Sequence, residues 1–225
     1  MQYRFFRVSA LLLVMMGLSL PATAAASRNY DKALKAAASV IRSIGDQVPT
    51  ESRDSARCVS VLNIAKGGFL FGGTGGHGFL TCKRSNGAWT APVVLKVGGG
   101  SVGFQIGGAK VELVMVFSNV GDIEQVARTV PLFSGKVSAT AGDKGAGISG
   151  GMGVEGGGEV VTVSRSEGLY VGAVGEAMVI DPDAAETAKL LGATHTLRQI
   201  LVEGRVPVPS KAKDFVEAVR HWHDG

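Results

Sequence analysis

The chain has 225 residues, 33 of them glycine, and a net charge of +4 at pH 7. So small a positive charge is not the signature of a nucleic-acid-binding protein, and nucleic acid is therefore excluded as the expected partner. The length suits one domain with a substantial hydrophobic core.

Residues 1–24 have the pattern of a secretory signal peptide. Arg4 and Arg7 precede an apolar run over residues 10–20, and a small-x-small cleavage motif follows at residues 22–24. The alternative is an uncleaved N-terminal anchor. Cleavage would remove both arginines and lower the net charge from +4 to +2. We therefore expect an exported protein, periplasmic or secreted, that is either free or peripheral to a membrane.

The first element of the mature chain is a helix over residues 30–44. Tyr30, Leu34 and Ile41 share one face at helical spacing. This stripe either packs into the core or lies on a membrane surface, with nearby lysines at the head groups. A short helical turn is expected at residues 49–52, before the sheet begins.

The middle of the chain alternates short apolar, β-branched pieces with glycine. Glycine inside a strand marks a bend, a bulge or a close backbone approach, so we expect a strongly curved antiparallel sheet. The expected strands are residues 58–64, 67–71, 78–84, 93–97, 102–106, 111–117, 136–140, 160–164, 169–174 and 177–180. Asn86-Gly87 predicts a type I′ hairpin turn, and residues 143–158 a mobile loop or a loosely paired ribbon.

Helices are expected after and within the sheet. The inserted helix would begin after Asn119, and the later ones would span residues 183–191, 196–202 and 210–223. The order predicts the α+β class: a curved, glycine-rich antiparallel sheet, either a sandwich or a partial barrel, flanked by N- and C-terminal helices.

Cys58 and Cys82 are the two cysteines of the chain. Export into an oxidising compartment favours a disulfide between them. The alternative is two buried free thiols in neighbouring strands.

Motifs for catalysis, cofactors and metals lack their structural context. Two G-x-G-x-x-G matches, at residues 73–78 and 151–156, do not open a helix, as a dinucleotide site requires. Ser149 lies in a G-x-S-x-G match with glycine on both sides, so a hydrolase is a minor alternative. His221 and His223 lack a third ligand of suitable spacing for a metal. We predict no enzyme activity, no cofactor and no metal.

Basic residues near turns and strand ends remain as candidates for binding. Such residues, together with glycine N–H groups, suit an anion such as a phosphate head group. The alternative is a solvated rim that keeps strand edges from aggregating. The predicted lipid-binding residues are Lys66, Lys83, Arg84, Arg53 and Arg57.

Several glycine-rich stretches, taken together, resemble one known family. They are residues 65–68, 72–78, 86–92, 100–108 and 164–172, followed in their order and spacing over about residues 30–204. The chain is similar to the SYLF family, found as a whole domain in bacterial exported proteins and beside SH3 or FYVE modules in eukaryotic ones. The resemblance implies a single SYLF-like domain over residues 25–225 that binds phosphoinositides or other phospholipids without catalysis.

The resemblance also implies actin-regulatory roles in eukaryotic members, which an exported protein would not share. The first hypothesis is therefore a non-enzymatic phospholipid-binding protein of the cell envelope that recognises anionic head groups. The alternative is a structural or interaction module of the envelope that binds protein or polysaccharide partners.

Overall fold

A computed structural model describes residues 29–118, 130–154 and 158–225. The expected signal peptide and the helix expected after Asn119 lie outside these residues. Within the described part, no helix is both long enough and apolar enough to cross a bilayer.

The expected N-terminal helix is confirmed as α1, Tyr30–Ile44. The Asn29 side chain caps it by accepting a hydrogen bond from the backbone N–H of Lys32, 3.0 Å away. A 3₁₀ turn (Gly45–Gln47) and the short helix α2 (Thr50–Asp54) follow, as expected from Pro49 and its polar neighbours.

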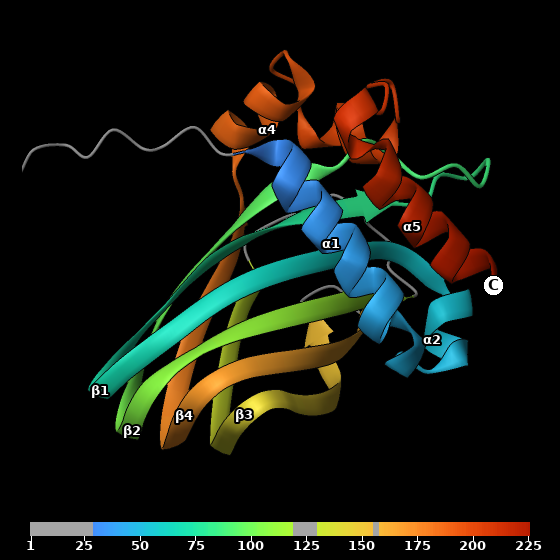
Figure 1. Cartoon of the computed structure of the whole chain (residues 1–225). Helices are drawn as coiled ribbons and strands as arrows, with labels where there is room; N and C mark the ends of the chain where they lie inside the picture. The colour runs from blue at the N-terminus through green and yellow to red at the C-terminus, as the bar shows by residue number, and fades with distance from the viewer. Residues whose placement is uncertain (1–28, 119–129, 155–157) are drawn as a thin grey trace, which may run out of the picture.

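The sheet consists of four long antiparallel strands in the order β1-β2-β4-β3. Their bounds are Ala56–Cys82 for β1, Val93–Ser118 for β2, Val130–Val154 for β3 and Gly158–Pro182 for β4. The predicted α+β class with flanking helices is confirmed. The strands bend sharply near their labelled ends, so the sheet folds over itself into two layers (Figure 1).

The prediction of many short strands was wrong, because the glycines bend the strands without interrupting their pairing. β1, β2 and β4 each cover three of the expected short strands, and β3 covers one, residues 136–140. Residues 143–154, expected as a loop or a loose ribbon, are paired with β4, with register shifts at Gly142/Gly145 and Gly150/Met152. Glycine lowers the cost of a bend, and the backbone hydrogen bonds continue through it.

β1 shows how one strand serves both layers. It turns back at Leu70, which has a positive φ of 62°. We call residues 56–68 its first limb and residues 72–82 its second limb. A Cβ on Gly76 would lie 2.3 Å from the carbonyl oxygen of Asn63, and a Cβ on Gly78 would clash in the same way with Val61. These two glycines therefore allow the limbs to meet backbone to backbone.

The Asn86-Gly87 turn is confirmed as a hairpin turn, but its type differs from the prediction. Lys83 and Trp89 form a β-bridge, and the N–H of Gly87 donates to the carbonyl of Arg84 over 2.9 Å. Type I′ needs a positive φ at both central residues, whereas Gly87, with φ 85°, is the one left-handed residue of this turn. The turn is therefore a three-residue loop with glycine in the left-handed position.

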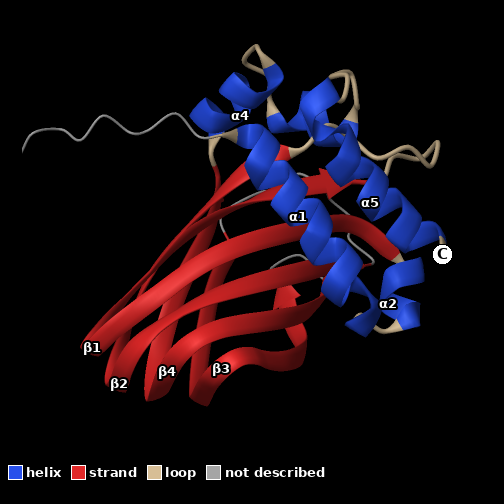
Figure 2. Ribbon diagram, viewed as in Figure 1, coloured by secondary structure: helices blue, strands red, loops and turns tan. Residues whose placement is uncertain are grey.

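Two hydrophobic clusters form the core. In the first, α1 and α5 (Lys213–Asp224) cover the outer face of the sheet, as Figure 2 shows. Leu34 and Ile41 are buried there, so the stripe of α1 is core packing rather than a membrane surface. The second cluster joins Leu62 of the first limb to Leu80 of the second, and so fills the space between the layers.

The C-terminal helices cover the upper edge of the folded sheet (Figure 1). Helix α4 (Ala184–Leu191) is capped by the Asp183 side chain and ends at Gly192, which has a φ of 81°. A short π-helical turn (Arg198–Val202) and a 3₁₀ turn (Ser210–Ala212) lead into α5.

Candidate functional site

The two limbs of β1 are joined at their open end by a disulfide between Cys58 and Cys82, whose Cα atoms lie 4.0 Å apart. Both cysteines are equally far from the bend at Leu70, which is why a strand folded in half brings them together. Next to the bond, the backbone N–H of Lys83 donates to the carbonyl oxygen of Arg57 over 2.7 Å. We call this region the disulfide end.

Two of the predicted lipid-binding residues, Arg57 and Lys83, are therefore neighbours in space although 26 positions separate them in the chain. Arg57 is exposed and Lys83 is half-buried. The disulfide end thus holds two cations at the start and finish of one strand.

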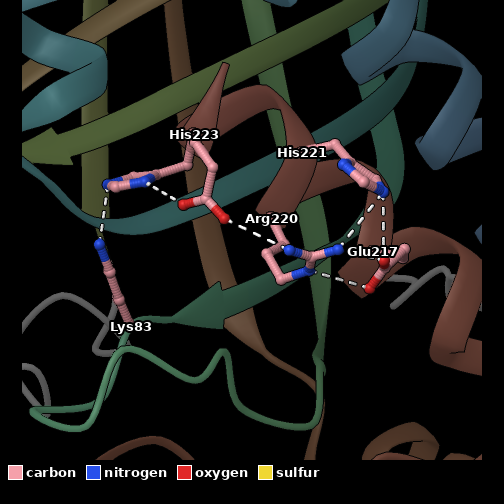
Figure 3. Close-up of polar contacts among 6 residues, drawn as sticks. Lys83, Glu217, Arg220, His221 and His223 are labelled. Carbon is pink, nitrogen blue, oxygen red and sulfur yellow. Dashed lines mark hydrogen bonds and ion pairs between the residues drawn. The ribbon is translucent and has the colours of Figure 1, made fainter.

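Lys83 belongs to a chain of polar contacts with α5 (Figure 3). Its Nζ lies 3.2 Å from Nε2 of His223, whose Nδ1 lies 3.1 Å from Oδ1 of Asp224. A lysine ammonium can only donate, so Nε2 must accept and Nδ1 must carry the proton that it donates to Asp224. The position of the Lys83 ammonium is therefore set by the end of α5.

The same chain of contacts continues along the exposed side of α5. Arg220 lies 3.4 Å from the other carboxylate oxygen of Asp224 and also pairs with Glu217. The hydrogen bond that Arg220 donates to Glu217 lowers the pKa of Glu217 and raises the pKa of Arg220. His221 Nε2 also approaches Glu217, to 3.1 Å. These pairs offset each other's charge.

Arg84 and Arg53 complete the group of predicted cations near this end. The guanidinium of Arg84 lies against Gly204, where an added Cβ would fall 2.3 Å from Nε. Arg53 lies in α2, 3.7 Å from Asp54, and its buried Nε has no hydrogen-bond partner.

Lys66 does not belong to this group. It lies on the first limb, eight residues beyond Cys58, which corresponds to about 26 Å along a strand. The structure therefore brings four of the five predicted residues to the region of α2 and the disulfide end, and places the fifth near the bend.

The bend carries exposed apolar side chains that the sequence analysis did not single out. Phe69 is 68% exposed, Leu70 43%, Phe71 72%, and Ile106 of β2, the register partner of Phe69, 59%. We call these four residues the apolar tip. A run of three apolar residues between glycine pairs, at 67–68 and 72–73, was the sequence signal that marks it.

A recess of about 300 Å³ lies between the disulfide end and the apolar tip, lined by both limbs of β1 and by β2 and β4. Glu112 and Arg165, register partners on β2 and β4, form an ion pair within it. Lys110 and Glu167 add one charge of each sign. Since the cations and carboxylates balance, the recess does not by itself select an anion.

The motifs tested for chemistry do not acquire their required context in the fold. The G-x-S-x-G match around Ser149 continues along β3 instead of turning from a strand into a helix, and residues 73–78 run within β1. His221 and His223 make separate contacts along α5 (Figure 3). No group of three or more His, Cys, Asp or Glu residues suited to a metal occurs among the described residues.

Comparison with known proteins finds one matching family model, described as "Ysc84: Las17-binding protein actin regulator", over residues 98–222. Similar curated proteins include the SH3 domain-containing protein PJ696.02 of Schizosaccharomyces pombe, 28% identical over 205 residues, which are 88% of this chain and 47% of that protein. Protein YSC84 of Saccharomyces cerevisiae is 28% identical over 221 residues, covering 88% of this chain and 46% of its own.

The human SH3 domain-containing YSC84-like protein 1 is 25% identical over 171 residues, which are 76% of this chain and 50% of that protein. The chain thus spans about half the length of the curated relatives it matches. No solved structure matches it.

Proposed function

Because this chain belongs to the Ysc84/SYLF family, we propose that it is a non-enzymatic phospholipid-binding protein of the cell envelope that recognises anionic head groups. The observation that supports this proposal is the gathering of cations at the disulfide end. Arg57 and Lys83 are adjacent through a backbone hydrogen bond, with Arg84 next in the chain. Each cation near an anionic surface contributes about 1 kcal/mol of attraction.

The relatives support a binding role in place of catalysis. Those with descriptive names are named for binding or for their domains, as in the LAS seventeen-binding protein 3 of Saccharomyces cerevisiae. The disulfide supports the placement in an oxidising compartment such as the periplasm or the exterior. Neither the phospholipid nor the compartment follows from the relatives' names.

The test is vesicle flotation of the purified mature protein, with neutral and anionic vesicles at low and moderate salt. We expect the wild type to float with anionic vesicles, and less so at moderate salt because salt screens exposed charges. The double variant Arg57→Glu and Lys83→Glu should bind at least about tenfold more weakly, since each substitution removes about 1 kcal/mol of attraction and adds repulsion from the anionic surface.

Lys32→Glu with Lys35→Glu is the matched control, because both lysines are exposed on α1, away from the disulfide end. Its binding should fall less than that of the Arg57/Lys83 variant. Absence of flotation with every vesicle would contradict lipid binding itself.

The second candidate is an interaction module that binds a protein partner. It is favoured by the description of the matching family as Las17-binding. Stable partners in a pull-down with no preference among vesicles would support it. Equal flotation with neutral and anionic vesicles would leave head-group recognition without support.

A further inference from the structure

The apolar tip points to a membrane contact at the opposite end of the strand from the disulfide. We propose that the folded edge of the sheet at β1 and β2 inserts into the interface of a lipid bilayer, with Phe69, Leu70 and Phe71 among the acyl chains. This inference rests on the proposed lipid binding, but it does not depend on the cations of the disulfide end.

Exposure of large apolar side chains is concentrated at this edge. Two phenylalanines lie exposed on either side of Leu70, and Ile106 lies opposite Phe69 on the neighbouring strand. A soluble surface tolerates single exposed apolar residues, but a contiguous cluster marks an interaction site or a membrane contact.

The backbone at Leu70 supports a functional origin of the cluster. Its φ of 62° lies in the left-handed region, where a non-glycine residue costs about 1–2 kcal/mol. The chain places glycine at 67, 68, 72 and 73 but leucine at the one strained position. A strained conformation that keeps a large apolar side chain exposed is the kind of outlier that accompanies a binding surface.

Charges are absent from the sequence on both sides of the bend. Residues 67–76 of β1 and 97–109 of β2 contain no charged side chain, and neither do residues 168–175 of β4 or 137–142 of β3. The register joins these segments in one row, from Phe69 to Ile106 and on across β4 and β3. β1 and β2 therefore carry no charge at the bend, whereas Glu176 of β4 and Lys136 of β3 each lie one position from the register row of Phe71.

The first charged residue before Phe69 on β1 and the first one after Ile106 on β2 are both lysines. Lys66 precedes Phe69 by three residues, about 10 Å along the strand, and the exposed Lys110 follows Ile106 by four, about 13 Å. An interfacial element buries its apolar part by about 5–10 Å, so these lysines reach the level of the phosphates. Glu167 of β4 lies opposite Lys110 in the register, so this level carries both signs, and the depth of the lysines relative to the exposed phenylalanines favours a bilayer interface.

The main test compares tip and control variants in a quantitative vesicle partition assay, with neutral and anionic vesicles. Phe69→Ser with Phe71→Ser removes two exposed apolar side chains from the tip, and Val179→Ser with Val202→Ser removes two exposed ones elsewhere. We expect the tip variant to partition at least about tenfold more weakly, because each phenylalanine buries a large apolar area on insertion. The control should partition as the wild type does.

A second measurement places the side chain within the bilayer. Phe71→Trp should show a blue-shifted emission on binding and quenching by lipids brominated in the upper acyl chain. Trp89 and Trp222 are buried and give a constant background, measured on the wild type. An unchanged emission of Phe71→Trp with bound vesicles would overturn the insertion.

The outcomes separate this inference from the proposed function. If the wild type does not float with any vesicle, both the proposed lipid binding and the insertion of the tip are wrong. If the wild type and the tip variant bind vesicles equally well, the tip does not insert, and the proposed lipid binding at the disulfide end remains. If the wild type is a dimer in lipid-free sedimentation and the tip variant a monomer, the tip is an interface between copies of this chain, and the inference is wrong.

Discussion

At the disulfide end, the two limbs of β1 are locked by a covalent bond and surrounded by charged side chains that pair with α5 and α2. At the other end, the same strand turns through one strained residue and presents apolar side chains to solvent. About 40 Å of strand separates Cys58 from Leu70. If the tip inserts with the strands inclined toward the bilayer plane, the disulfide end faces the same head groups, so both ends contribute to one bound orientation and the loss of either weakens binding.

The two ends of the folded strand β1 require different residue types. Close packing of the limbs needs glycine at Gly76 and Gly78, whereas exposure at the bend needs side chains that glycine lacks. Stability is thus concentrated toward the disulfide end, and the bend is the place where a change of side chain has little effect on folding. A change at one end should therefore leave the property of the other end unaltered.

Removal of the disulfide should have the largest effect. The bond joins cysteines 24 positions apart, and closing a loop of that length stabilises the folded state by about 3 kcal/mol. Cys58→Ala with Cys82→Ala should therefore lower the Tm by about 6–12 °C in a thermal unfolding experiment. Reductant should lower the Tm of the wild type and leave that of the variant unchanged; an equal Tm for both proteins would contradict the prediction.

Crowding the limbs should have a smaller but still large effect. A Cβ on Gly78 would lie 2.2 Å from the carbonyl oxygen of Val61 and 2.5 Å from the side chain of Leu62, whereas one on Gly75 meets nothing within 4 Å. We expect Gly78→Ala to cost about 2–3 kcal/mol, because the limbs must separate. Gly75→Ala is the matched control and should be neutral or stabilising by about 0.5 kcal/mol.

Urea unfolding of both glycine variants measures this difference. Equal free energies of unfolding would show that the limbs are not in close contact at Gly78. The partition of Gly75→Ala into vesicles should match the wild type, because that position lies outside the apolar tip.

The strained residue at the bend gives a prediction that separates stability from binding. Leu70→Gly removes about 1 kcal/mol of strain, but glycine also costs about 0.5–1 kcal/mol in chain entropy, so stability should change little. The exposed part of the leucine side chain would be lost from the bilayer, which weakens partition by roughly fivefold. Leu70→Ala keeps the strain and loses the side chain, so it should weaken partition equally and be less stable than Leu70→Gly.

The sequence predicts the helices and the positions of the strand segments, but not that these segments join into long strands. Apolar spacing was enough to predict α1, and the helix expected over residues 183–191 is confirmed as α4, since both signals are local; the caps at Asn29 and Asp183 are seen only in the structure. The strands were expected as short pieces because glycine usually ends a strand, and only the tertiary pairing shows that Gly72 and its neighbours lie within one continuous strand.

The candidate site was predictable in part for the same reason. The two cysteines were expected to pair, and the bond between Cys58 and Cys82 confirms the disulfide and brings the flanking basic residues together. The link from Lys83 to His223 depends on how α5 packs, which no local pattern reveals. The exposure of Phe69 was missed because apolar residues in a strand usually face the core, and only the bend turns them outward.

The smallest expected effect concerns the ion pairs of α5 beside Lys83. The hydrogen bond from Arg220 lowers the pKa of Glu217 below its usual range, so the contribution of the ionised carboxylate is present at neutral pH and lost as the pH falls through the lowered pKa. Glu217→Gln should therefore be slightly less stable than the wild type at pH 7 in urea unfolding, and the two should converge in acid. Glu51→Gln, an exposed glutamate of α2, is the charge control.

Because the pairs of Glu217 are exposed, added salt should shrink the difference at pH 7. A difference that persists in acid would mean that Glu217 acts through packing, and the polar chain that leads to Lys83 would then be independent of its charge.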